Sequence, residues 1–206
     1  MWIRRQYRES GRFLREEVLK LFLVLCAAFV ALTALSGTVL AVNGDSLNAF
    51  VQQIAEMFEE KGLFENGGIS FPKLLLKNLW AAVFSIALGC IPFLFLPALP
   101  FFSNAAVLGA MAALYQSTGI GLPAFALGVL PHGILELPAL ILSFSLGLYL
   151  CWTLTVKLTL HRQRSFKRAL INVGRVYVLV ILPLLVVAAL IETYLTPMLM
   201  GVSFGA

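Results

Sequence analysis

Two ionisable residues, His132 and Glu136, lie four positions apart inside an apolar part of the chain. In a helix this spacing puts both side chains on one face, where an imidazole and a carboxylate can touch. Ionisable side chains at membrane depth are costly, so they normally face a protein interior or a wet cavity. Glu192 is the other carboxylate that stands apart from the charged segments. We therefore predict that His132, Glu136 and Glu192 form one intramembrane polar cluster.

Three functions are compatible with such a cluster. In the first it is structural: His132 hydrogen-bonds a carboxylate, and backbone groups freed by nearby prolines take the remaining partners. In the second it binds an ion or a small solute, or relays protons, because transporters combine broken helices with intramembrane carboxylates. In the third the three side chains hold a metal ion in an intramembrane hydrolase.

The hydrolase hypothesis has the least support in the sequence. A catalytic zinc site usually takes three protein ligands and most often more than one histidine. The other histidine of the chain, His161, falls in a basic segment that we expect on the cytoplasmic side. Ser143 and Ser145 lack the G-x-S-x-G context of a serine nucleophile. We therefore expect no catalytic residues, no metal and no cofactor.

Three residues beside His132 are expected to break the helix that carries it. Pro131 and Pro138 lack a backbone donor, and Gly133 disfavours helix. Upstream, the apolar run from Asn104 to Ser117 has about 14 residues, too few to cross about 30 Å of hydrocarbon upright. Broken or re-entrant helices are therefore expected around residues 104–133.

The same run carries small residues at every fourth position. Ala105, Gly109 and Ala113 form a stripe, preceded by Asn104, that lets another helix approach closely. The partner is either a second copy of the chain, which would make a homodimer, or another helix of the same chain. Spacing alone leaves both alternatives open.

The composition places the whole chain in a membrane. Of the 206 residues, 60% are hydrophobic and only 12% are charged, which is too little polar surface for a soluble globule. The net charge of +5 comes from basic residues that flank apolar spans, as expected beside anionic lipid headgroups, and nucleic-acid binding is not expected. Cys26, Cys90 and Cys151 all lie within apolar spans and support neither disulfides nor a zinc site.

The order of apolar and charged segments predicts an all-α bundle with about five transmembrane crossings. Residues 1–20 are predicted to form a basic interfacial helix, and residues 21–206 a transmembrane domain. Residues 43–72 are predicted to form an extracytoplasmic amphipathic helical loop. Residues 157–175 are basic with no acidic residue, so they are expected in the cytoplasm, with the N-terminus inside and the C-terminus outside. We expect a multi-pass protein of the cell membrane.

The segment Leu130-Pro-His-Gly-Ile-Leu-Glu-Leu-Pro-Ala139 contains a PHG-x-x-E element. This specific element resembles a motif of the stage II sporulation protein M family of bacterial and archaeal integral membrane proteins, and the likeness covers roughly residues 70–200. The segment Ala188-Ala-Leu-Ile-Glu-Thr-Tyr-Leu-Thr-Pro197 adds to it. Asn104-Ala-Ala-Val-Leu-Gly109 is similar to the family's N-G-x-x-x-G element, with Ala105 where glycine is usual.

This resemblance implies a membrane component of a larger assembly. The family's namesake belongs to an engulfment complex of sporulating bacteria and partners proteins that remodel peptidoglycan, while other members occur in organisms that do not sporulate. His132, Glu136 and Glu192 match the family's motifs, which assign no chemistry to them. We expect a non-enzymatic scaffold or partner-anchoring protein. Its expected partners are the lipid bilayer and other membrane or envelope proteins, and a second copy in the homodimer alternative. A small-solute or ion transporter is the first alternative and the metal-dependent hydrolase the last.

Overall fold

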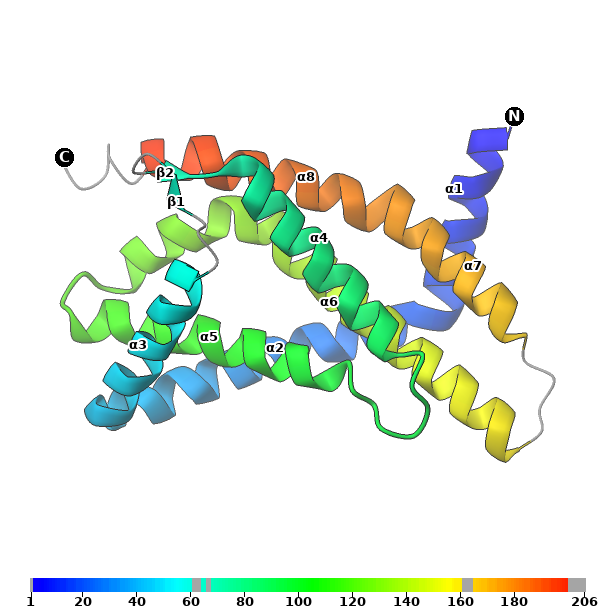
Figure 1. The fold of residues 1–206 in the computed structure, drawn as a ribbon, viewed down its shortest axis with the longest axis horizontal. Helices are drawn as coiled ribbons and strands as arrows, with labels where there is room; N and C mark the ends of the chain where they lie inside the picture. Colours follow the sequence, from blue (N-terminus) through cyan, green and yellow to red (C-terminus); the bar gives the residue numbers. More distant parts are fainter. Residues whose placement is uncertain (1, 61–63, 66–67, 161–164, 200–206) are drawn as a thin grey trace.

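The computed structural model describes residues 2–60, 64–65, 68–160 and 165–199 of the chain. In this part of the chain, five helical stretches are long and apolar enough to cross a membrane. They pack as an all-α bundle, which confirms the predicted fold class (Figure 1). The five stretches are Arg4–Val42, Phe71–Leu88, Ala98–Ser117, Leu122–Thr159 and Phe166–Leu199.

The first stretch bends at a π-helical segment. Helix α1 (Trp2–Phe13) passes through the π-helical segment η1 (Leu14–Val18) into α2 (Leu19–Val42). Figure 1 shows α1 turning away from the direction of α2 at this point. Phe13 is buried, and its ring meets that of Tyr149 edge-on at 5.2 Å. The basic helix predicted over residues 1–20 therefore corresponds to α1 and η1, and its last turn is packed into the bundle.

A second helix follows at the far end of α2. Helix α3 (Gly44–Glu60) lies within the loop that was predicted to contain an amphipathic helix. An antiparallel pair of two-residue strands, β1 (Phe64–Glu65) and β2 (Gly68–Ile69), follows it. The turn predicted between these strands includes positions 66–67, which lie outside the described residues.

The next two helices are joined by a proline-rich connection. Helix α4 (Phe71–Leu88) ends before Pro92, and α5 (Ala98–Ser117) begins directly after Pro97. Helix α5 has 20 residues, which is about 30 Å and enough to cross the hydrocarbon. The prediction that this run is too short was wrong because the helix begins before Asn104, at Ala98, and includes Pro100 in its first turn. Proline is tolerated in the first turn of a helix, where its missing N–H would have had no partner.

The long helix α6 (Leu122–Thr159) is the centre of the bundle. In its most apolar stretch 61% of the residues are buried, against 11–28% in the other four spans. Phe144 of α6 meets Phe101 of α5 edge-on at 5.7 Å. At Gly147 the backbone of α4 comes so close that an added Cβ would lie 2.4 Å from the carbonyl oxygen of Ser85. Small residues thus let α4 and α6 touch along their backbones.

The expected break around residues 104–133 lies at the turn between α5 and α6. Gly119 and Gly121 adopt positive φ angles of 76° and 88° there, a conformation that glycine adopts without steric cost. Helix α6 then continues through Pro131, Gly133 and Pro138, so the prediction that these three residues end the helix was wrong. Figure 1 shows α6 bending along its length instead. A proline inside a helix removes one hydrogen bond and kinks the axis.

The last span is a continuous helical stretch that includes two π-helical segments. It comprises α7 (Phe166–Val176), η2 (Tyr177–Ile181), α8 (Leu182–Leu190) and η3 (Ile191–Leu195). Helix α8 packs against both α4 and α6. The last turns of this span therefore lie beside the helix that carries His132.

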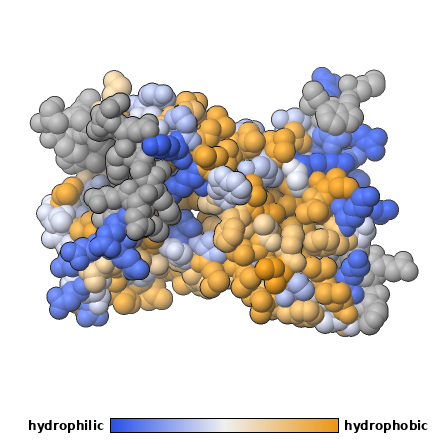
Figure 2. All heavy atoms as spheres, in the orientation of Figure 1, coloured by the Kyte–Doolittle hydropathy of each residue, from blue (hydrophilic) through white to orange (hydrophobic). Residues whose placement is uncertain are grey.

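The connections between the helices lie at two opposite ends of the bundle. In Figure 1, α1, the α4–α5 connection and the adjoining ends of α6 and α7 lie at one end. The opposite end holds α3, the α5–α6 turn and η3. Figure 2 shows hydrophobic residues over much of the face between these ends, and hydrophilic residues gathered toward the ends themselves. This arrangement fits five crossings with all connections at the membrane surfaces.

Candidate functional site

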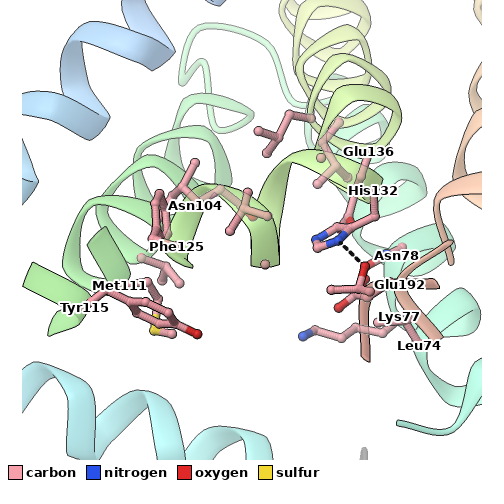
Figure 3. Close-up of a pocket in the computed structure, with 18 of the residues that line it drawn as sticks. Leu74, Lys77, Asn78, Asn104, Met111, Tyr115, Phe125, His132, Glu136 and Glu192 are labelled. Atoms are coloured by element: carbon pink, nitrogen blue, oxygen red, sulfur yellow. Dashed lines mark hydrogen bonds between the residues drawn. The ribbon is translucent and has the colours of Figure 1, made fainter. Parts of the chain in front are cut away.

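Three ionisable residues from two spans meet inside the bundle. His132 and Glu136 lie on α6, one helical turn apart, and Glu192 lies on η3. One ligand atom from each, the imidazole nitrogen or a carboxylate oxygen, lies within 4.8 Å of the other two. All three side chains are half-buried. The structure thus brings together the residues of the predicted cluster (Figure 3).

The cluster lines a cavity of about 620 Å³ between α4, α5, α6 and the last span. Figure 3 shows the ionisable side chains on one side of this space, and Tyr115, Met111 and Phe125 together with Asn104 on the other. The rings of Tyr115 and Phe125 meet edge-on at 5.8 Å, so this second wall is aromatic. The cavity is therefore amphipathic, with charged groups facing an aromatic and apolar wall.

Helix α4 supplies two further polar residues to the charged side. Asn78 is 5% exposed, and its side-chain nitrogen Nδ2 has no hydrogen-bond partner among the described residues. Lys77 lines the cavity beside it and interacts electrostatically with both Glu136 and Glu192. The site therefore contains two carboxylates, one ammonium group, one imidazole and an amide donor.

Thr196 contacts the imidazole from the end of the last span. Its hydroxyl Oγ1 lies 3.5 Å from Nδ1 of His132, the contact drawn dashed in Figure 3, and 3.3 Å from the carbonyl oxygen of Ile191. Through this contact the hydroxyl helps to orient the ring. The residues after α8 therefore contribute to the cluster at two positions, Glu192 and Thr196.

The stripe of small residues on α5 faces away from this cavity. Gly109 packs on α2, where an added Cβ would lie 2.5 Å from the carbonyl oxygen of Thr33. Ala113 is buried in a cluster with Leu47 of α3. Ala105 is also buried, and its carbonyl oxygen accepts a hydrogen bond of 3.3 Å from Ser36 of α2. The stripe therefore packs against α2 and α3 of the same chain. It does not form the interface of the homodimer considered above.

Asn104, which was predicted to pack with that stripe, instead lines the cavity. Its side-chain nitrogen donates to the carbonyl oxygen of Pro100 at 2.7 Å. The neighbouring Ala105 is buried toward α2, so successive residues of α5 serve different faces. Successive residues of a helix point in different directions, so Asn104 faces the cavity while Ala105 faces α2.

A comparison with protein-family models completes this description. The family model of stage II sporulation protein M matches residues 20–197 of the chain. The chain belongs to the stage II sporulation protein M family. No curated protein and no solved structure matches the chain in the corresponding comparisons.

For this member of the stage II sporulation protein M family, sequence reasoning missed part of the site. A lysine near the end of a span, such as Lys77, is expected to extend to the membrane surface, and the sequence does not single out Asn78, Tyr115 or Thr196. A signal was present for Asn78, because an amide inside an apolar span is costly unless it faces the protein interior. For Thr196 there was none, since hydroxyls are common in membrane helices and usually bond to the backbone.

Proposed function

We propose that this member of the stage II sporulation protein M family is a non-enzymatic membrane scaffold that anchors partner proteins at the membrane surface. Family membership supports a membrane component of this kind. The observation that carries the proposal is the placement of α3, which lies at one end of the bundle and packs against α5 (Figure 1). A helix fixed in this way offers a folded surface to another protein.

The two faces of α3 differ in their surroundings. Leu47 is 3% exposed and packs with Ala110 and Ala113 of α5, so the described part of the apolar face contacts the bundle. Gln52, Gln53 and Glu56 are exposed. Because docking has already fixed the helix, a partner that binds its polar face does not have to order it first. The partner we propose is the extracytoplasmic domain of an envelope protein.

Site-specific photocrosslinking tests this role. A photoreactive amino acid at Gln53 should give a discrete adduct in native membranes, and the same substitution at Gln116 should not. Gln116 is a matched control, since it is also an exposed glutamine and lies at the same end of the bundle. Equal adducts at both positions, or none at Gln53, would argue against anchoring through α3.

A second candidate function is transport of a small solute or an ion. It is favoured by one observation, the 620 Å³ cavity between spans with His132, Glu136 and Glu192 on its wall. Polar sites between membrane helices are where transporters bind their substrates. We expect proteoliposomes containing the protein to show ion or proton flux that the substitution Glu136→Gln abolishes. Flux equal to that of empty liposomes would remove this candidate.

A further inference from the structure

We propose that His132, Glu136 and Glu192 bind a divalent transition-metal ion, for which zinc is the best fit, and that a further coordination position opens into the cavity. The inference goes beyond the scaffold role and does not depend on it. Metal binding is also measured without any flux, so it stands or falls separately from transport.

The geometry of the three ligand atoms supports this inference. They lie within 4.8 Å of one another and come from two separate helical spans. Around a tetrahedral zinc ion with bonds of about 2.0 Å, ligand atoms are about 3.3 Å apart. The three groups therefore have to move inward by about 1.5 Å at most. Rotation about the side-chain bonds of the glutamates supplies movement of this size without a change in the backbone.

The types of ligand select the class of metal. One imidazole nitrogen and two carboxylate oxygens suit zinc and similar transition-metal ions. Calcium and magnesium prefer oxygen ligands alone, and magnesium usually keeps several waters. His132 and Glu136 are separated by one turn of α6, a spacing at which two side chains on the same helix face can bind one ion. Sequence reasoning considered the same three ligands and disfavoured a metal because only one of them is a histidine. The structure adds that their ligand atoms lie within 4.8 Å of one another.

The local charge also favours a divalent cation. Glu136 and Glu192 face each other in a cavity whose other wall is aromatic and apolar. Two like charges taken out of water are costly unless they are paired. Lys77 contributes one positive charge beside them. A divalent ion between the carboxylates offsets both negative charges directly.

A buried polar group at the same place also fits a ligand. Asn78 is 95% buried and lines the cavity beside Glu136, and its amide nitrogen Nδ2 makes no hydrogen bond of standard geometry to the described residues. A buried donor without a well-formed hydrogen bond is costly. A water or an anionic oxygen on the open position of the metal would accept this hydrogen bond. The hydroxyl of Thr196 already contacts Nδ1 of His132 at 3.5 Å. With a metal bound, this hydroxyl would orient the imidazole through the ring nitrogen that does not bind the ion.

Metal analysis of the purified protein tests the inference. The full chain, stripped with a chelator and freed of any affinity tag, is incubated with zinc chloride, gel-filtered and analysed for zinc by mass spectrometry. A competing fluorescent chelator gives the affinity. We expect one zinc per chain, and a loss of affinity of more than about 100-fold in each of His132→Ala, Glu136→Gln and Glu192→Gln, since even outer-sphere partners are worth 10- to 100-fold. Asn78→Ala should keep the stoichiometry and weaken binding by about 10-fold.

Controls separate loss of the site from loss of the fold. Glu56→Gln removes an exposed carboxylate on α3 and should leave zinc affinity unchanged. Gel filtration and circular dichroism identify variants that fail to fold. For these, cobalt bound to the wild-type protein provides the second measurement, because its visible absorption reports four-coordinate nitrogen and oxygen ligation. Wild-type protein that retains no more zinc than His132→Ala, or a folded Glu192→Gln variant with unchanged affinity, would overturn the inference.

Discussion

Gly37 of α2 and Gly109 of α5 meet backbone to backbone: a Cβ added to Gly37 would lie 3.0 Å from the carbonyl oxygen of Gly109. In lipid, where apolar side chains gain little by leaving solvent, such close contacts are a main source of helix association. Ser36 adds a hydrogen bond across the same interface, to the carbonyl oxygen of Ala105. The pair of glycines therefore sets how closely α2 and α5 approach.

Gly109→Ala should destabilise the protein without changing its oligomeric state. The new methyl group would meet the backbone at Thr33 and Gly37, and overpacking of this kind costs about 1–3 kcal/mol. Gly174→Ala on α7 is the matched control, because no atom lies within 4 Å of its added Cβ and alanine favours helix by about 0.5–1 kcal/mol. Unfolding in detergent measures both effects. Loss of a dimer from an otherwise stable Gly109→Ala protein would place the stripe between subunits instead.

Glu136→Gln and Glu192→Gln should change stability in a non-additive way. The two carboxylates belong to one cluster with His132, so each substitution alters the surroundings of the other. Groups in one network show coupling energies of about 0.5–3 kcal/mol in double-mutant cycles. The free energies of unfolding of the wild type, both single variants and the double variant give this coupling. A cycle of Glu136→Gln with the exposed Glu56→Gln should be additive, and a coupling of zero for the first cycle would contradict the shared cluster.

Glu9→Gln should loosen α1 from α7. Glu9 forms ion pairs with Arg5 at 2.7 Å on its own helix and with Arg175 at 2.6 Å on α7. We expect a small loss of stability that shrinks as salt is added, because ion pairs near the surface are weak and are screened by salt. Glu16→Gln removes the more exposed pair with Arg12 and should have a smaller effect. Equal losses for the two variants would show that the contact with α7 contributes nothing specific.

Cysteine labelling should establish which end of the bundle is cytoplasmic. In a variant without the native cysteines, we expect a cysteine at Gln52 to react with an impermeant reagent added to intact cells. A cysteine at Ser165 should react only after the membrane is opened, because the segment around it is basic. Both positions are exposed in the structure. The reverse pattern would invert the predicted orientation.

The sequence predicts the class and the outline of this fold because length, hydropathy and charge determine them. It misplaces features that depend on neighbouring helices. Pro131 and Pro138 were expected to break α6, yet in a bundle other helices can stabilise a kinked helix through a proline. Pro100 likewise proved to lie inside the first turn of α5. Local residue preferences do not contain this tertiary information.

The candidate site was predicted in part for the same reason. The three ionisable residues stand out in an apolar sequence, and burial cost alone indicates that they gather in the interior. Lys77 does not stand out, because a lysine near the end of a span normally extends to the headgroups. Its place in the cavity follows from the packing of α4 against α6 and α8. Such contacts set the rotation of α4 about its own axis, and this rotation decides which of its side chains face the cavity.

Because Glu192 follows Glu136 by 56 residues, the cluster cannot exist until the last span has been made. At ordinary rates of synthesis, about 5–20 residues per second, the ribosome needs roughly 3–11 s to add those residues. Until those residues are in place, His132 and Glu136 lack the carboxylate of Glu192 and the hydroxyl of Thr196 that complete their surroundings. Completion of the polar site therefore depends on the arrival of the final helix.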